Sequence, residues 1–420
     1  MARAAVVGAG LAGLVAARHL AEAGIDVELF EENPEVGGRV RSVREDGFTF
    51  DRGFQVLFTA YPAARRELDY GALSLRRFTP GAVVARLGER SVLSDPVRDP
   101  GALTETLFNR EISLADKLRT FALQRELRRK DGEAILNGDD ADIETYLADR
   151  GFSRRYVENF AAPFFGGITL DRSLSASSVV FEYAFKMLAS GEIAVPADGM
   201  GAIAGQLADR ARDAGATIHT GARVEAVTPD GDGAALSVGG ETESFDACVV
   251  ATDPRTAEDL TGVETPGEPR GCVTQYFSLP EHVDLDAGKR IVLNAGDARP
   301  NEVVPLSTVA PEYAPDGVQL LSATFLGDPD EPEVALAAAV REALESWYPA
   351  RRFDDLELLR TERVPFSQFA QPPGFRRTLP AADAPDGPVY LAGDYTRWSS
   401  IDGALESGKR AADALSGDLE

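Results

Sequence analysis

Cysteine, histidine and long apolar runs are scarce in this chain of 420 residues, which holds two cysteines and three histidines. Cys248 and Cys272 are too few for a disulfide framework, and their spacing is not that of metal ligands. No run approaches the roughly 18 apolar residues that a membrane-spanning helix needs. The first strand-like stretch starts at residue 4, and no charged leader precedes it. We therefore expect a cytoplasmic protein without a metal site or a transmembrane segment.

Basic residues are outnumbered, and lysine is nearly absent. The chain holds 68 acidic and 43 basic residues, a formal net charge of −25, and only five of the basic residues are lysine. The electric field of so negative a surface repels nucleic acid and anionic membranes, so no nucleic-acid partner is expected. Peripheral contact with a membrane is still compatible with the sequence. An acid-rich surface that keeps arginine but avoids lysine is typical of halophilic proteins from cells that accumulate salt. An acidic protein from an ordinary environment is the alternative.

Glycine, in contrast, is abundant, and three glycines form a nucleotide-binding pattern near the start of the chain. Apolar residues 4–7 predict a buried strand, and Gly8, Gly10 and Gly13 follow it in the spacing GxGxxG. The first glycine makes the turn, the second lets the backbone approach a pyrophosphate, and the third lets the helix pack closely on the strand. Because the helix N-terminus then faces the phosphates, the segment predicts dinucleotide binding.

An acidic residue completes this pattern. A helical stretch over residues 14–23 stops at Gly24, and a second strand over residues 27–30 leads to Glu31, eighteen positions after Gly13. A carboxylate at this position accepts hydrogen bonds from both ribose hydroxyls and repels a 2′-phosphate. A glycine-rich turn in an ordinary α/β unit is the alternative. Strand, helix, second strand and acidic residue nevertheless occur in the order that a Rossmann-like unit requires.

Two further motifs carry a resemblance to a known family. The tripeptide Gly-Gly-Arg stands at residues 37–39, soon after the ribose acid, and Asp-Arg-Gly stands at residues 51–53. In this order the motifs resemble those of the superfamily of flavin amine oxidases, protoporphyrinogen oxidases and phytoene desaturases. The resemblance implies that the cofactor is FAD.

The same resemblance implies roles for individual residues. Arg39, preceded by Gly38, is expected to reach the phosphates or the ribityl chain of FAD. Gly53 is expected to let the backbone pass close to the isoalloxazine, with Phe54 and Gln55 beside the ring. An ordinary solvated surface charge is the alternative for Arg39.

A motif near the C-terminus strengthens the resemblance. A buried strand over residues 389–392 leads to Gly393 and Asp394, and a helix begins near Gly403 and Ala404. Asp394 resembles the acid that holds the ribityl hydroxyls. The amides of Gly403 and Ala404 are expected to meet the N1–C2=O edge of the flavin, which gains negative charge on reduction. The amino-acid sequence of this motif is most similar to that of plant-type phytoene and zeta-carotene desaturases.

A third candidate cofactor segment lies in the middle of the chain. Gly199, Gly201 and Gly205 suggest a second dinucleotide site for NADPH, but their spacing is GxGxxxG, which argues against it. The family resemblance instead implies that this segment feeds a strand that brackets the adenine of FAD at Val224. The expected elements are a strand over residues 192–195, a helix over residues 202–214 and a strand over residues 222–227.

The order of these segments predicts the domain organisation. We expect an α/β protein with a Rossmann-like FAD-binding domain of the glutathione-reductase type and an interleaved α+β substrate domain. The FAD-binding domain is assigned to residues 1–79, 192–270 and 362–420, and the substrate domain to residues 80–191 and 271–361.

Aromatic residues within the predicted substrate domain suggest the nature of the substrate. An aromatic wall that contains methionine suits a long apolar molecule, whereas ordinary hydrophobic core is an equally good interpretation. The residues concerned are Phe160, Phe164, Phe165, Phe181, Phe185 and Met187.

These observations predict an FAD-dependent oxidoreductase that transfers a hydride from a carotenoid-like or isoprenoid-like substrate to flavin N5. Amine oxidases of the family usually place an aromatic residue between the C-terminal Trp and the Gly-Ala pair, and residues 399–402 contain none. An amine oxidase and a protoporphyrinogen oxidase are the alternative enzymes. A lipid-binding protein similar to prenyl-protein escort proteins is the non-enzyme alternative. The catalytic residues and the electron acceptor, quinone or oxygen, stay unassigned.

Overall fold

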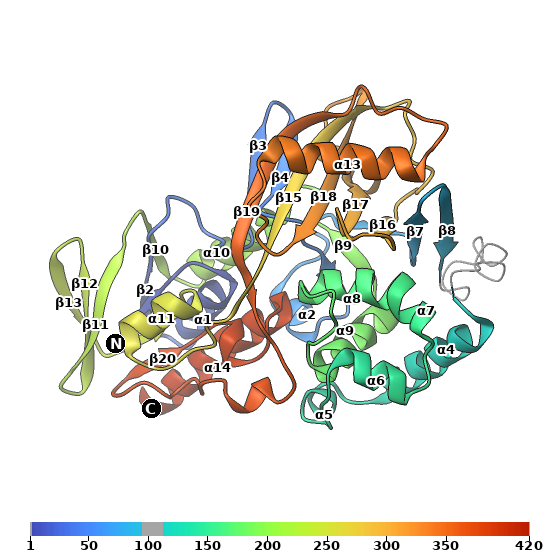
Figure 1. Cartoon of the computed structure of the whole chain (residues 1–420). Coiled ribbons are helices and arrows are strands. Elements are labelled where there is room, and N and C mark those ends of the chain that lie inside the picture. The colour runs from blue at the N-terminus through green and yellow to red at the C-terminus, as the bar shows by residue number, and fades with distance from the viewer. Residues whose placement is uncertain (1, 95–111, 420) are drawn as a thin grey trace.

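A five-stranded parallel sheet organises one lobe of the computed structural model, which describes residues 2–94 and 112–419 (Figure 1). The strand order is β10-β2-β1-β14-β20, and every neighbouring pair is parallel. The strands are β1 (Arg3–Val7), β2 (Asp26–Glu31), β10 (Thr217–Thr220), β14 (Ala247–Val250) and β20 (Val389–Leu391). Strands from the beginning, middle and end of the chain therefore share one sheet, as the predicted α/β fold requires.

Three helices pack together beside this sheet. Helix α1 (Leu11–Glu22) lies against both α10 (Gly201–Asp213) and α14 (Ile401–Leu419). A Cβ at Gly408 of α14 would lie 2.2 Å from the Ala12 carbonyl oxygen, so this glycine lets the two backbones approach closely. An antiparallel sheet of β11 (Val224–Asp230), β12 (Gly233–Val238) and β13 (Glu241–Phe245) contacts β1 and β14.

A seven-stranded sheet forms the second lobe, in the order β19-β15-β18-β17-β16-β7-β8. Helix α13 (Glu333–Trp347) packs on one face of it through Leu336, Val340 and Leu344 (Figure 1). The strands are β7 (Ala82–Arg86), β8 (Glu89–Leu93), β15 (Pro269–Pro280), β16 (Ile291–Asn294), β17 (Glu302–Pro305), β18 (Val318–Leu326) and β19 (Glu357–Phe369).

A group of helices lies beside the second sheet, coloured from teal to green in Figure 1. Phe165 is central to it, with its ring centroid 4.5 Å from that of Phe181 and 5.1 Å from that of Phe164. Phe165 and Phe181 are fully buried, whereas Phe160 and Phe164 are half-buried, so part of the predicted aromatic wall is core. The helices are α4 (Leu114–Arg129), α5 (Gly132–Leu136), α6 (Ile143–Asp149), α7 (Arg154–Tyr156), the π-helical turn η2 (Val157–Ala161), α8 (Ala162–Thr169) and α9 (Ser178–Ser190).

The middle cofactor segment differs from expectation. Its first strand, β9 (Ile193–Val195), pairs antiparallel with β5 (Leu57–Phe58) and β6 (Arg76–Arg77) instead of joining the parallel sheet. The strand that follows α10 in the parallel sheet is β10, which the sequence analysis missed, and the strand predicted over residues 222–227 is β11. The sequence Thr-Ile-His-Thr of β10 has no apolar run to mark it, because its residues are exposed or half-buried.

The remaining short elements connect these parts. A Cβ at Gly199 would lie 2.5 Å from Ser42 Oγ, so this glycine is needed for packing against β3, which argues against a second nucleotide site. The elements are β3 (Ser42–Glu45), β4 (Phe48–Asp51), α2 (Pro62–Glu67), α11 (Pro254–Thr261), α12 (Leu306–Val309) and the 3-10 turns η3 (Pro311–Tyr313), η4 (Phe375–Arg377) and η5 (Asp394–Thr396).

Two long strands join the lobes. The predicted domain boundaries at 270/271 and 361/362 fall inside β15 and β19, which run from the seven-stranded sheet towards the parallel sheet (Figure 1). The division into two domains stays a prediction, and residues 95–111 of the predicted substrate domain lie outside the described residues. Within residues 2–94 and 112–419, every helix is too short or too polar to cross a bilayer.

Candidate functional site

The glycine-rich turn after β1 leaves open space at the N-terminus of α1. Gly8 has φ +102°, and a Cβ there would lie 2.8 Å from the Ala251 carbonyl oxygen. A Cβ at Gly13 would lie 1.9 Å from the Gly8 carbonyl oxygen, whereas one at Gly10 would meet nothing within 4 Å. Gly10 is also the N-cap of α1 and supplies no side-chain acceptor to its first amides. Unpaired amides beside open space fit a phosphate group.

Glu31 ends β2 beside this turn. Its side chain is 6% exposed, and Oε2 accepts a hydrogen bond of 2.7 Å from the Ala9 amide. Oε1 accepts from the Asn33 amide at 3.0 Å and from Asn33 Nδ2 at 2.6 Å. A carboxylate has about four lone-pair sites, so acceptor capacity remains for a ribose hydroxyl. The carboxylate is thus fixed where the sequence analysis expects the ribose.

The predicted adenine-bracketing segment lies next to Glu31. The Ala222 amide donates to the Glu31 carbonyl oxygen at 2.8 Å, and the chain then enters β11 at the buried residue Val224. Val224 therefore follows, by two residues, a backbone hydrogen bond to Glu31, although it belongs to the antiparallel sheet and not to the parallel one.

The first and last cofactor motifs meet through Arg39 and Asp394. Arg39 Nη2 donates to Asp394 Oδ1 at 2.6 Å, and Nη1 donates to Oδ2 at 3.2 Å. Asp394 is 3% exposed and also accepts from Ser399 Oγ at 2.7 Å. Bidentate pairs of this kind are geometrically specific. They bring together residues that are far apart in the sequence, and Arg39 is not the solvated surface charge weighed as its alternative.

Gly38 and Gly53 shape the backbone around this pair. Gly38 has φ +57°, and a Cβ there would lie 3.4 Å from Gly10 Cα. The Gly-Gly-Arg loop therefore faces the glycine-rich turn after β1. Gly53 has φ +83° and lies over the second sheet, where a Cβ would be 3.7 Å from Cys272 Sγ. The next residue, Phe54, donates its amide to Thr274 Oγ1 at 3.3 Å. This loop therefore contacts the face of the seven-stranded sheet opposite α13.

The amides of Gly403 and Ala404 have hydrogen-bond partners at the start of α14. The Gly403 amide donates to Ser400 Oγ at 2.8 Å, and the Ala404 amide donates to the Ser400 carbonyl oxygen at 3.0 Å. A contact of these amides with the flavin edge stays a prediction, and both already have acceptors within the chain. The cause is Ser400, a serine at the helix N-cap, whose side chain accepts from the third helical amide. A Cβ at Gly403 would lie 2.1 Å from the Trp398 carbonyl oxygen, so close packing accounts for this glycine.

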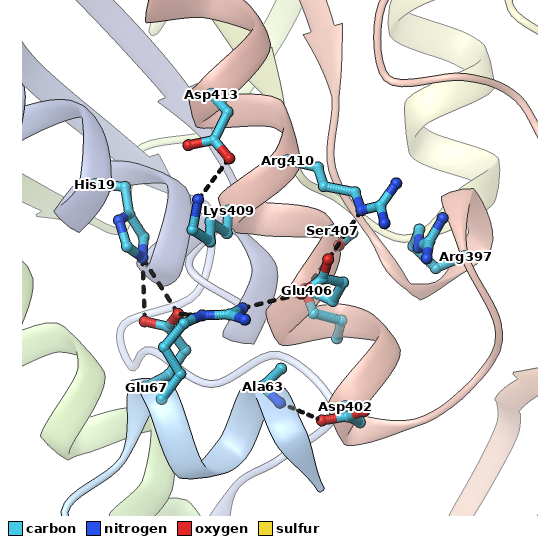
Figure 2. A network of polar contacts seen from close by, with 12 residues as sticks. His19, Ala63, Glu67, Arg397, Asp402, Glu406, Ser407, Lys409, Arg410 and Asp413 are labelled. Atoms are coloured by element: carbon cyan, nitrogen blue, oxygen red, sulfur yellow. Dashed lines mark hydrogen bonds and ion pairs between the residues drawn. The ribbon is translucent and has the colours of Figure 1, made fainter. Parts of the chain in front are cut away.

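A polar network that sequence reasoning missed holds α2 against α1 and α14 (Figure 2). Glu67 is fully buried, and His19 Nε2 lies 3.2 Å from both of its carboxylate oxygens. Burial alone would raise the pKa of Glu67, but hydrogen bonds from His19 and Arg66 bring it below its usual range. Asp402 accepts from the Ala63 amide at 2.8 Å, so two separate carboxylates fix α2.

Asp402 also connects to a small aromatic group. The Tyr183 hydroxyl donates to Asp402 Oδ2 at 2.6 Å, and the rings of Tyr183 and Trp398 meet edge to face at 5.2 Å. Trp398 is 4% exposed, and its Nε1 is buried without a hydrogen-bond partner. Buried polar groups are normally satisfied, so an unsatisfied indole N–H beside the last cofactor motif fits a bound group. Tyr183 carried no motif that could have marked it.

Among the described residues, no cluster of three or more His, Cys, Asp or Glu could hold a metal ion. The cofactor motifs instead converge on the carboxyl ends of β1 and β2 and on the start of α14. A parallel sheet with a glycine turn after its first strand and a carboxylate after its second defines a dinucleotide-binding fold. The open space at Gly10 and the Trp398 Nε1, which has no hydrogen-bond partner, fit such a ligand.

The family model for flavin containing amine oxidoreductases matches residues 11–416, so the chain belongs to this family. It is therefore an FAD-dependent oxidoreductase. The resemblance stated from the motifs and the expected cofactor are both confirmed.

Relatives in sequence and structure extend over most of the chain. It is 27% identical to a hydroxysqualene dehydroxylase of Rhodopseudomonas palustris over 98% of this chain and 97% of the relative. It is 32% identical to a zeta-carotene-forming phytoene desaturase of Myxococcus xanthus over 60% of this chain and 53% of the relative. The fold is similar to that of a putative protoporphyrinogen oxidase from Exiguobacterium, with a TM-score of 0.73 and 18% identity over 99% of each chain.

Proposed function

We propose that this FAD-dependent oxidoreductase acts on a long, apolar, isoprenoid-like molecule. The observation that carries the proposal is the set of residues between Trp398 and Gly403, Ser-Ser-Ile-Asp, which supplies no aromatic cage for an amine. The half-buried rings of Phe160 and Phe164 add apolar surface beside the second sheet. Burying apolar substrate surface is worth about 25 cal/mol per Å², whereas a cationic amine would lose water without an aromatic cage to replace it.

The named relatives support the same substrate class. One of them is named for hydroxysqualene and another for phytoene, and both molecules are isoprenoids. The first name also suggests a second candidate reaction, a reductive dehydroxylation that runs the hydride in the opposite direction. We favour hydride transfer from the substrate to flavin N5, as in a desaturation.

The chain's own residues then have distinct tasks. Bound FAD supplies the hydride acceptor at N5. We propose that Glu31 binds the ribose, that Gly8, Gly10 and Gly13 admit the pyrophosphate, and that Arg39 with Asp394 binds the phosphates or the ribityl chain. The remaining proposed cofactor contacts are Gly38, Gly53, Phe54, Val224, Gly393, Gly403 and Ala404. With the cofactor fixed by these groups, the second sheet and the helices have only to orient a C–H bond and exclude water.

The substrate class is tested by anaerobic reduction of the flavin. Phytoene in detergent is expected to bleach the flavin absorbance of the purified protein, and putrescine is expected to leave it unchanged, because residues 399–402 supply no aromatic cage for an amine. Protoporphyrinogen serves as the third substrate. Rapid bleaching by putrescine alone would assign the protein to the amine oxidase branch, and bleaching by protoporphyrinogen alone would assign it to the porphyrinogen branch.

We further propose that the protein works in the cytoplasm with peripheral membrane contact, and that quinone or oxygen reoxidises the flavin.

We also propose that the acidic surface is an adaptation to high salt. The net charge of −25 supports this proposal. Repulsion among carboxylates destabilises a compact chain at low ionic strength, and salt screens it. We therefore expect the melting temperature to rise by several degrees from low to molar potassium chloride, measured by circular dichroism. A melting temperature independent of salt would reject halophily.

A further inference from the structure

One buried carboxyl group, that of Glu302, lies in the second lobe outside the cofactor motifs. Glu302 begins β17, and in the register of the seven-stranded sheet it lies beside Thr324 of β18, which in turn lies beside Thr274 of β15. Residues in register point to the same face of a sheet. Their neighbours Val273, Val303 and Ala323 belong to the core under α13, so Glu302, Thr324 and Thr274 face away from that helix.

This row of polar groups leads to the loop proposed to lie beside the flavin ring. Thr274 Oγ1 accepts the Phe54 amide at 3.3 Å and lies 3.5 Å from Thr324 Oγ1. Thr324 hydrogen-bonds Glu302. Because neighbouring strands are about 4.8 Å apart, Glu302 lies only about 10 Å from Thr274 across the sheet.

The other side of Glu302 faces the aromatic helix α8. A Cβ at Gly167 would lie 3.6 Å from Glu302 Oε2 and 3.1 Å from Asn301 Nδ2, so the absence of a side chain keeps this approach open. Gly167 is three residues after Phe164, one of the half-buried rings proposed to contact the substrate. The carboxyl group therefore lies between the aromatic cluster and the flavin loop.

The immediate partners of Glu302 leave its charge uncompensated at close range. The residue is 5% exposed, and Asn301 Nδ2 donates to Oε2. The Arg172 guanidinium donates to Asn301 Oδ1 at 3.1 Å and to the Asn294 carbonyl oxygen at 2.7 Å, so it acts on Glu302 through Asn301 and through its field. Among the described residues, the other titratable group affected by this carboxylate is Cys272 of β15, whose pKa the negative charge of Glu302 helps to raise.

Burial raises the pKa of Glu302 to about 7, against the lowering effect of the hydrogen bonds from Asn301 and Thr324 and of the charge of Arg172. A carboxyl group with this pKa is present in both protonation states near neutral pH, which suits it to proton transfer. Solvent is also near, because Arg172 lines an open pocket of about 400 Å³ together with Asp297 and Arg299.

We propose that Glu302 is the proton acceptor of the reaction, an inference that rests on the proposed desaturation. A hydride leaves one substrate carbon with two electrons, which the flavin accepts and passes to quinone or oxygen. The carboxylate of Glu302 takes the proton from the adjacent carbon, and the electron pair of that C–H bond becomes the new C=C bond. The protonated carboxyl group then returns its proton to solvent.

The kinetic test compares Glu302→Gln with Glu182→Gln under anaerobic reduction by phytoene. Glu182 is a matched control, because it is also a buried glutamate but bonds Tyr146 on the helical side. In the wild type and the control, the rate of flavin reduction is expected to rise with pH through about 7. Glu302→Gln is expected to keep its FAD, to reduce the flavin about 10²–10⁴-fold more slowly and to lose the pH dependence.

A second measurement needs no substrate. Infrared spectra of the holoenzyme, taken as wild type minus Glu302→Gln, isolate the carboxyl C=O band of Glu302 from those of Asp51 and Asp402, whose pKa values burial also raises. The band is expected to titrate near pH 7 in the oxidised protein. Its midpoint is expected to rise when dithionite reduces the flavin, since the N1–C2=O edge then gains negative charge nearby.

The two measurements separate the inference from the proposed function. If phytoene bleaches wild type and Glu302→Gln at the same rate and with the same pH profile, the role of Glu302 is overturned and the substrate class stands. If phytoene bleaches neither protein, the substrate class fails. In that case the infrared titration still tests the position of Glu302. If reducing the flavin leaves the titration midpoint of the Glu302 band unchanged, the placement of Glu302 beside the cofactor is overturned. A raised midpoint upholds it.

Discussion

Gly13→Ala is expected to yield a protein without bound FAD and with a free energy of unfolding lower by about 1–3 kcal/mol or more. The added methyl group would lie 1.9 Å from the Gly8 carbonyl oxygen and 3.2 Å from Ala251 Cβ. Because the first obstacle is backbone, α1 has to move away from β1, and its N-terminus then leaves the phosphate position. Flavin absorbance after purification and urea unfolding measure the two effects.

Gly205 offers a matched control for this substitution. It also lies inside a helix, α10, but a Cβ there would meet nothing within 4 Å. Gly205→Ala is expected to retain FAD and to gain roughly 0.5–1 kcal/mol of stability, because alanine favours helix. Full flavin content in Gly13→Ala would show that the close packing of α1 on the turn is not needed for the cofactor.

Asp394→Ala is expected to be the second most damaging change. It leaves Arg39 without its bidentate partner, and removing one member of a buried ion pair costs about 3–5 kcal/mol. The Arg39 side chain is 31% exposed, so the lower end of this range applies. FAD binding is expected to fail as well, since both motifs lose their common contact. Equilibrium dialysis with FAD and urea unfolding provide the measurements.

Asp413→Ala, in the helix α14 that follows Asp394, is the control. Asp413 pairs with Lys409 one turn away at 2.5 Å on the exposed face of α14 (Figure 2). Pairs of this kind contribute about 0.3–0.5 kcal/mol, so the variant is expected to bind FAD normally. Equal losses in Asp394→Ala and Asp413→Ala would contradict the proposed importance of the Arg39–Asp394 pair.

The sequence predicted the parts of the fold that follow local rules. Gly8, Gly13 and Glu31 lie within one strand-helix-strand unit, where spacing alone determines which residues meet. The family resemblance gave roles to Arg39 and Asp394 separately, but only the structure shows that they pair. Strand β10 was missed because half-exposed polar residues carry no periodic signal.

The features that escaped prediction depend on long-range register. Glu302 is an ordinary acidic residue in a chain with 68 of them, and nothing nearby in the sequence marks it. Its burial and its row with Thr324 and Thr274 arise from strands that meet across a seven-stranded sheet. The cap of α14 also escaped prediction, because it depends on one rotamer, that of Ser400.

The joining of the two ends of the chain through Arg39 and Asp394 has a consequence for biosynthesis. During translation, β1, α1 and Glu31 emerge early, whereas β20 and α14 emerge late. Until they do, β14 lacks its neighbour β20, and the face of α1 that Gly408 covers stays exposed. If the C-terminal motif binds FAD as proposed, we expect the cofactor to be loaded after translation, and a nascent chain stalled before residue 389 to present apolar surface to chaperones and to carry no flavin.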